Sequence, residues 1–183
     1  MDDEPSLVRV VAGYLEREGF TVDTAADGEA AVAAARDRAT AGATAGLHPG
    51  EVIWFDNGFY VELKDAAGNP ATEVLIDPAN GTVTTEPGPA MMWNTRYGMH
   101  GLANYPTGSA AITATRAQQI ATGWLAANLP DRLAAPPDNY PGYYTMETTT
   151  SAGTVNGMLS VNATNGQVWY HSWHGRFVAK DDS

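Results

Sequence analysis

An internal repeat is the feature that most constrains the fold of this chain. Residues Gly58–Leu63 and Gly142–Glu147 both open on a glycine and an aromatic residue and continue with the alternation of a β-strand. Each copy closes on Asn-Gly-x-Val, and Gly166 of the second copy follows Gly81 of the first by 85 residues. A spacing well above the ~20–50 residues of a solenoid unit indicates a duplicated small domain. The repeated residues are those of strands and turns, so the duplication favours binding or regulation over catalysis.

The composition limits the kinds of partner that the chain is expected to bind. The chain has 183 residues and a formal net charge of -11. Nucleic acids and anionic membranes are bound by clustered Lys and Arg, so neither is expected here, and a protein or peptide partner is expected instead. The absence of cysteine excludes disulfides and thiolate metal sites.

The first residues and the hydropathy of the chain indicate where in the cell the protein is expected. No apolar run reaches the ~18 residues of a membrane span. The opening Met1–Glu4 is acidic where an export signal would be basic. As written, the chain is expected in the cytoplasm.

Hydrophobic periodicity predicts an α+β fold. From Glu51 the period is two, and Asn-Gly pairs between the apolar runs are strong hairpin signals. The predicted strands are Val52–Phe55, Phe59–Lys64, Thr72–Ile76, Thr82–Thr84, Tyr143–Thr148, Val155–Val161 and Gln167–Tyr170. A helix capped by Thr113 or Thr115 and ended by Pro130 opens the second copy. Each copy is thus predicted as a helix packed on a small antiparallel sheet, preceded by a short helix–strand–helix segment over residues 1–39.

The repeats resemble PepSY-type domains. Residues Asp77–Val83 fit the Asp/Asn-x-x-x-Gly-x-Val hairpin of these domains, and Asn162–Val168 fits it with Asn in the first place. The linker Glu86–Asn94 and the ending Gly166–Gly175 are similar to a tandem-PepSY family of bacteria and archaea. The resemblance covers roughly residues 28–178. It implies a non-catalytic inhibitor-like or sensor module, usually outside the cytoplasm.

The front of the chain resembles the start of a response-regulator receiver domain. Asp2, Asp3, the run Gly19–Val22 and the run Ala26–Ala31 carry this resemblance. In that family the paired acids hold magnesium and a later aspartate takes a phosphoryl group. The first strand is missing here, and the later Thr/Ser and Lys are not found. The resemblance implies a truncated fragment and, as an alternative function, a two-component signalling protein that has lost phosphotransfer.

These patterns divide the chain into five parts. They are a truncated receiver-like segment (1–27), a first PepSY-like repeat (28–87), a Met/Gly/Pro linker (88–110), a second PepSY-like repeat (111–178) and a charged tail (179–183). No Ser-His-Asp set or phosphate loop accompanies them, so the chain is not expected to be an enzyme.

Tryptophans mark a candidate ligand surface. Aromatic side chains serve as contact anchors, and they gather in the linker and near the last repeat strand. The predicted ligand-binding residues are Trp93, Tyr97, Trp169 and Trp173, in a cleft between the repeats. The alternative is that these rings form the core between the two repeats.

Histidines mark a candidate metal site. His171 and His174, joined by His100, could bind a metal. Thioethers are soft donors that suit Cu(I), and three lie in the linker: Met91, Met92 and Met99. Residues 171–177 are predicted to be extended, and a strand places residues i and i+3 on opposite faces unless a bulge intervenes. The alternative is that the histidines are ordinary strand residues and the methionines fill gaps.

Asp2 and Asp3 are candidates for magnesium.

Overall fold

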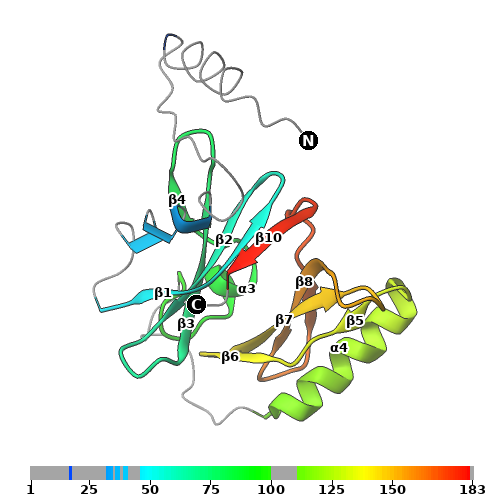
Figure 1. Cartoon of the computed structure of the whole chain (residues 1–183). Coiled ribbons are helices and arrows are strands. Elements are labelled where there is room, and N and C mark those ends of the chain that lie inside the picture. Colours follow the sequence, from blue (N-terminus) through cyan, green and yellow to red (C-terminus); the bar gives the residue numbers. More distant parts are fainter. Residues whose placement is uncertain are drawn as a thin grey trace.

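Two antiparallel β-sheets form the body of the protein, which confirms the α+β class with more strand than helix (Figure 1). The computed structural model describes residues 17, 32–34, 36–37, 39–40, 46–99 and 111–181. The first sheet has the order β10-β1-β2-β3-β4. Its strands are β1 (His48–Phe55), β2 (Gly58–Lys64), β3 (Pro70–Ile76), β4 (Val83–Thr85) and β10 (Phe177–Asp181).

The second sheet has the order β5-β7-β8-β9, and β6 also pairs with β7. Its strands are β5 (Leu133–Ala134), β6 (Asp138–Tyr140), β7 (Tyr143–Thr149), β8 (Val155–Asn162) and β9 (Val168–Tyr170). Two helices are α3 (Pro89–Met92), in the predicted linker, and α4 (Ala114–Asn128). The short strands β5 and β6 were not predicted from the sequence, because two or three residues carry too little alternation.

The same turn joins the last two strands of each predicted repeat. The side chain of Asp77 accepts the N–H of Ala79 at 2.8 Å, and that of Asn162 accepts the N–H of Thr164 at 2.9 Å. Gly81 and Gly166 then adopt φ of 67° and 74°, in the left-handed region that glycine enters at little cost. These are the hairpins that the Asn-Gly pairs predict.

Helix α4 covers the outer face of the second sheet. The Thr113 side chain accepts the N–H of Arg116 at 3.2 Å and caps the helix, as the sequence predicts. Ala117, Ala121 and Leu125 recur at helical spacing and are fully buried. They pack on the outward side chains of β7 and β8, namely Tyr144, Met146, Leu159 and Val161.

Helical residues between 32 and 40 cover the outer face of the first sheet in the same way. Val32 and Ala39 are buried against the outward side chains of β2 and β3. The alternate side chains of those strands, Tyr60 and Glu73, point inward and meet the second sheet. Both sheets are therefore buried on two faces, with apolar outer layers and a mixed layer between them.

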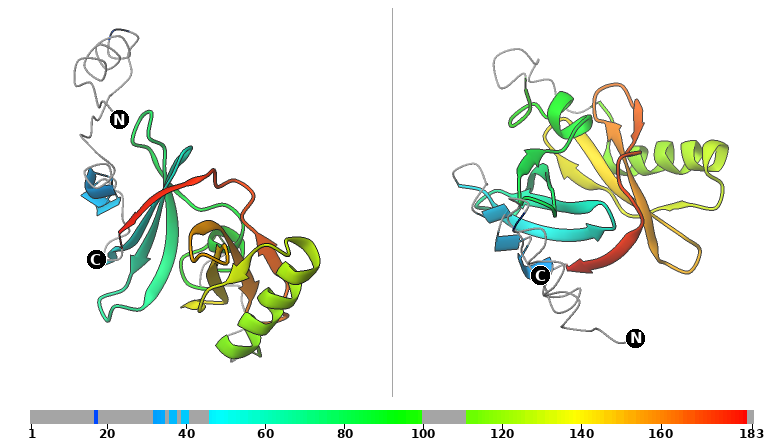
Figure 2. Two further views of the ribbon diagram at one scale, coloured as in Figure 1. Left: turned by 45° about the vertical axis from the view of Figure 1, so that its right-hand side comes forward. Right: turned by 90° about the horizontal axis from the view of Figure 1, so that it is seen from above.

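The C-terminal strand returns to the first sheet. Sequence analysis predicts an extended piece over residues 171–177 and a charged tail from residue 179, and this is wrong. Residues 172 and 173 form a turn, and β10 pairs antiparallel with β1, Ala179 opposite Trp54. The charge of Lys180 is met by carboxylates from both sheets, Glu51 at 2.6 Å and Glu147 at 2.9 Å. Figure 2 shows this strand, in red, running from the second sheet across to the first.

The structure also bears on the start of the first sheet and on membrane spans. The first strand begins earlier than the predicted Val52, since residues 48–50 also belong to β1. The acids Asp2 and Asp3 and the other residues of the receiver-like resemblance lie outside the described residues. Within the described part of the chain, no helix has the length and apolar character needed to cross a membrane.

Removing β10 is expected to destabilise the whole fold. A chain ending at Arg176 loses the pairing with β1, the packing of Phe177 against Ile53 and Phe55, and the Lys180 ion pairs. We expect a loss of about 2–4 kcal/mol in the free energy of unfolding, measured by urea denaturation. A chain ending at Asp181 is the control and should match the parent. Equal stability of the two truncated chains would show that β10 contributes nothing.

Candidate metal centre

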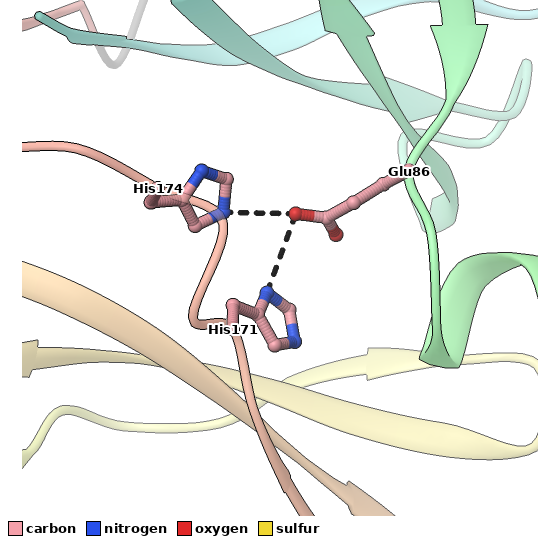
Figure 3. A group of neighbouring side chains, drawn as sticks. All are labelled: Glu86, His171 and His174. Atoms are coloured by element: carbon pink, nitrogen blue, oxygen red, sulfur yellow. Dashed lines mark ion pairs between the residues drawn. The ribbon is translucent and has the colours of Figure 1, made fainter. Parts of the chain in front are cut away.

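A carboxylate and two imidazoles meet between the sheets. Glu86 follows β4 directly, and His171 and His174 lie in the loop between β9 and β10. The Oε1 atom of Glu86 is 2.9 Å from Nε2 of His174 and 3.3 Å from Nδ1 of His171. One potential ligand atom of each residue lies within 4.8 Å of the others. Figure 3 shows the three side chains converging from these two segments.

A turn brings the two histidines to the same side. The N–H of His171 bonds to the carbonyl of Met158 at 3.0 Å, and the N–H of Ser172 bonds to that of Tyr170 at 3.1 Å. The backbone then turns, so His171 and His174 do not point to opposite faces as they would on the strand predicted here. Gly175 follows, where a Cβ would collide with Asp56, so the loop needs glycine at this close approach.

The first sheet holds this loop in place. The side chain of Asn57 donates to the carbonyl of Trp173 at 2.7 Å and accepts the N–H of Gly175 at 2.8 Å. Arg176 adds a charged contact to Asp56 at 2.9 Å. The β1–β2 turn therefore positions the histidines from outside the loop that carries them.

Glu86 is charged although it is fully buried. Burial raises the pKa of this carboxyl group, but the nearby imidazoles, His171 first and then His174, outweigh burial and lower the pKa to about 2. The indole N–H of Trp173 also donates to Oε1 at 3.1 Å. At neutral pH the site therefore offers a carboxylate.

The pKa of the His174 imidazole lies below its usual value. Burial lowers its pKa, and the neighbouring Glu86 only partly offsets that effect. Phe55 stacks on its ring with centroids 4.3 Å apart, and Trp173 stacks on His171 at 4.7 Å. A neutral imidazole carries the free lone pair that a metal ion needs, and the aromatic rings fix its orientation and exclude water.

Three buried polar atoms of this cluster have no hydrogen-bond partner within the described part of the chain. They are Oε2 of Glu86, Nδ1 of His171 and Nε2 of His174. The two nitrogens lie close to Oε1 of Glu86, but not in the geometry of a hydrogen bond. Buried polar atoms are almost always paired, so two unpaired imidazole nitrogens that converge on one carboxylate call for a missing partner such as an ion.

The aromatic residues predicted to bind a ligand lie in two separate parts of the structure. Trp93 is buried and meets Trp169 edge to face at 5.5 Å, while Trp169 is 36% exposed. A Cβ on Gly88 would lie 3.1 Å from both Trp169 and Trp173, so these indoles pack on the glycine backbone. Tyr97 instead lines a separate hollow of about 400 Å³.

Two of the three methionines predicted as copper donors are exposed, unlike the cluster. Met92 is 38% exposed and Met99 is 69% exposed, whereas the side chains of Glu86, His171 and His174 are 0–3% exposed. His100 lies outside the described residues. Sequence analysis named both histidines but missed Glu86, because an acid beside Pro87 resembles a linker residue. Its one signal was position: it lies two residues after the predicted strand Thr82–Thr84.

In comparisons with known proteins, no family model matches the chain, and no curated protein and no solved structure matches it either.

The depressed pKa of Glu86 predicts an acid-sensitive fold. Its pKa is 4.5 in an ordinary environment and about 2 in the folded protein, so its stabilisation is complete above about pH 4.5 and is lost as pH falls toward 2. Glu86→Gln should flatten this dependence in chelator-treated protein and cost about 3–5 kcal/mol at pH 7, as when a buried charge pair is broken. Chemical denaturation across this pH range measures both effects. The exposed control Asp37→Asn should keep the parental profile, and a parental profile in Glu86→Gln would contradict the prediction.

The pKa of Asp138 is shifted upward, in the opposite direction to that of Glu86. It lies at an acidic hollow of about 280 Å³ with Glu51, Glu62 and Lys64. Burial of its carboxyl group, followed by the charges of Glu62 and Glu147, raises its pKa from 3.8 to about 6, so stability is lost as pH rises from about 4 through 6. Asp138→Asn should raise the melting temperature at pH 7 and leave it unchanged at pH 4. The residue as a whole is exposed, so solvent screening keeps the gain small. A lower melting temperature at pH 7 would contradict this.

Proposed function

We propose that this protein is a non-catalytic metal-binding regulatory module, built from two PepSY-like units, that holds a divalent transition-metal ion between Glu86, His171 and His174. The observation that carries the proposal is the convergence of two buried imidazole nitrogens without hydrogen-bond partners in the described part of the chain on the buried Glu86 carboxylate. A buried charge cluster without an ion would leave these atoms unsatisfied at a cost of about 1–3 kcal/mol each.

The donor set indicates the class of ion. One carboxylate oxygen and two imidazole nitrogens suit borderline ions such as Zn²⁺ or Co²⁺, whereas Cu(I) prefers sulfur and Mg²⁺ prefers oxygen. Ligands of a tetrahedral ion with bonds of about 2.0–2.1 Å stand about 3.3 Å apart. The separations of 2.9 and 3.3 Å from Glu86 Oε1 to His174 and His171 are close to that spacing. The copper prediction is thus replaced by a zinc-like ion.

A non-catalytic role is supported by burial. The three side chains are 0–3% exposed, and aromatic rings stack on both histidines, so a substrate has no contact with the ligand atoms. The PepSY-like identity is supported by the matched architecture of the two halves, each with helical residues on the outer face of an antiparallel sheet and an Asn-Gly hairpin. A protein or peptide remains the proposed partner of such a module.

Metal titration tests this function. The chelator-treated parent is titrated with Co²⁺ and Zn²⁺ against a competing chelator, and the d–d absorption of Co²⁺ reports its coordination. We expect one ion per chain and at least a ~100-fold weaker Kd in His171→Ala/His174→Ala, since two of three ligands are lost. The control is His48→Ala, which removes an exposed histidine of β1 and should bind as the parent does. Equal, micromolar-or-weaker binding in parent and double variant would leave the cluster as an ordinary buried charge network.

A further inference from the structure

A hollow of about 230 Å³ lies at one end of the first sheet, beside the candidate metal centre. Of the three candidate ligands, His174 borders this hollow, while Glu86 and His171 do not. In the described part of the chain, the hollows beside Tyr97 and Asp138 are bordered by none of the three. A buried metal site needs a path by which the ion enters, and this hollow reaches one of the ligands.

Strand alternation places the hollow and Glu86 on the same face of the first sheet. Thr84 of β4 lies opposite Leu75 of β3, and both border the hollow. Glu86 lies two residues beyond Thr84, and its N–H bonds to the carbonyl of Glu73 at 2.9 Å, which continues the pairing of β3 with β4. Side chains two residues apart on a strand share a face. The hollow and the Glu86 side chain are therefore neighbours on the inner face of this sheet.

The hollow is polar at its mouth and apolar further in. Its exposed residues are Asn57, Asp77 and Thr84, and Asp77 carries a carboxyl group. Its walls include the buried or half-buried side chains of Phe59, Leu75 and Ile76. A negative charge at the opening of a cleft with low-dielectric walls raises the local concentration of cations. The mouth therefore favours the entry of a metal ion over that of an anion.

The His174 ring borders both the hollow and the Glu86 carboxylate. Its Nε2 atom lies 2.9 Å from Oε1 of Glu86 and is buried, although the residue lines the hollow. An ion that arrives through the hollow meets this ring before it meets Glu86 or His171. The ring must turn to present Nε2 to that ion.

We propose that this hollow is the route by which the metal ion enters and leaves the centre, with Asp77 attracting the ion at the mouth and the His174 ring turning to admit it. The inference rests on the proposed metal-binding function. Every residue that borders the hollow belongs to the first sheet, its turns or the loop after β9. The ion can therefore exchange while the two units stay docked, and a partner that covers the mouth traps the ion without touching its ligands.

A wider side chain at the mouth tests the route. In Thr84→Trp an indole on the edge strand β4 narrows the hollow. We expect Co²⁺ to associate and dissociate at least ~10-fold more slowly than in the parent, with Kd unchanged because both rates fall together. Stopped-flow absorption of Co²⁺ in chelator-treated protein gives the association rate, and capture of released Co²⁺ by excess chelator gives the dissociation rate. The matched control Thr85→Trp places the same ring on the opposite face of β4, beside Val74, and should keep the parental rates.

Removal of the charge at the mouth tests the role of Asp77. Asp77→Asn should keep the turn, because Asn162 makes the same side-chain bond in the equivalent turn of the second repeat. Association of Co²⁺ should slow, most clearly at low ionic strength, while dissociation stays parental. The control Asp131→Asn removes an exposed carboxylate between α4 and β5 and should keep both rates.

Chemical modification tests the route without a metal ion. Diethyl pyrocarbonate modifies accessible imidazoles, and peptide mass spectrometry of briefly treated, chelator-stripped protein compares their reactivity. We expect the exposed His48 to react fastest, His174 more slowly and the fully buried His171 slowest. Thr84→Trp should slow the reaction of His174 and leave that of His48 unchanged.

The outcomes separate the route from the function. Co²⁺ binding with parental rates in folded Thr84→Trp and Asp77→Asn would overturn the route and leave the metal-binding function standing. A His174 ring as unreactive as that of His171 would also overturn it. A parent that binds no Co²⁺ would refute the metal-binding function, and the route with it.

Discussion

The layer between the two sheets depends on how buried carboxylates are satisfied. Charged carboxylates are costly in a low-dielectric interior unless they are paired or hydrogen-bonded. Glu62 meets the ammonium group of Lys64 at 3.0 Å, and Glu86 meets His171 and His174. Glu73, whose pKa is raised by burial and by Glu86, accepts from the phenols of Tyr60 and Tyr143. Both partners of Glu86, and the Tyr143 partner of Glu73, come from the second unit or from the loop that leaves it. Docking of the units and satisfaction of these buried groups are therefore one event, which gives the pairing a geometry that an apolar layer alone would not specify.

Strand β10 ties the two units together, because the chain leaves the second sheet after β9 and pairs with the first sheet. Each half could be a separate small domain if the chain ended after β9. Instead, the loop after β9 carries His171 and His174 past Glu86, and the chain then adds a strand to β1. Lys180 finishes the connection by pairing with one glutamate from each sheet. The two ligand segments lie at matching places in the two sheets, since one directly follows β4 and the other directly follows β9. The residues after these two strands meet at Glu86, His171 and His174.

Features that depend on neighbouring residues could be predicted from the sequence, whereas features that depend on contacts between distant residues could not. The Asn-Gly turns and the Thr113 cap rest on a few neighbouring residues, so patterns suffice to predict them. Strand β10 was read as a tail because Lys180 and Asp181 are charged, and only the fold supplies the carboxylates and the Arg36 guanidinium that neutralise them. Glu86 was missed for the same reason. Its partners lie 85 and 88 residues away in the chain, and no periodicity links an acid in a Pro-rich segment to histidines after a distant strand.

The unpaired atoms at Glu86, His171 and His174 carry a thermodynamic consequence for regulation. Without an ion, the folded chain bears the cost of three buried atoms with no hydrogen-bond partner in the described region. An ion held as proposed would remove that cost only where the segment after β4 and the loop after β9 are together, so it would bind the docked form alone. Binding to one state alone stabilises that state by about 2.7 kcal/mol at a ligand concentration 100 times Kd. Linkage is reciprocal, so a partner that favours docking of the two units would raise the affinity for such an ion, and a partner that separates them would expel it.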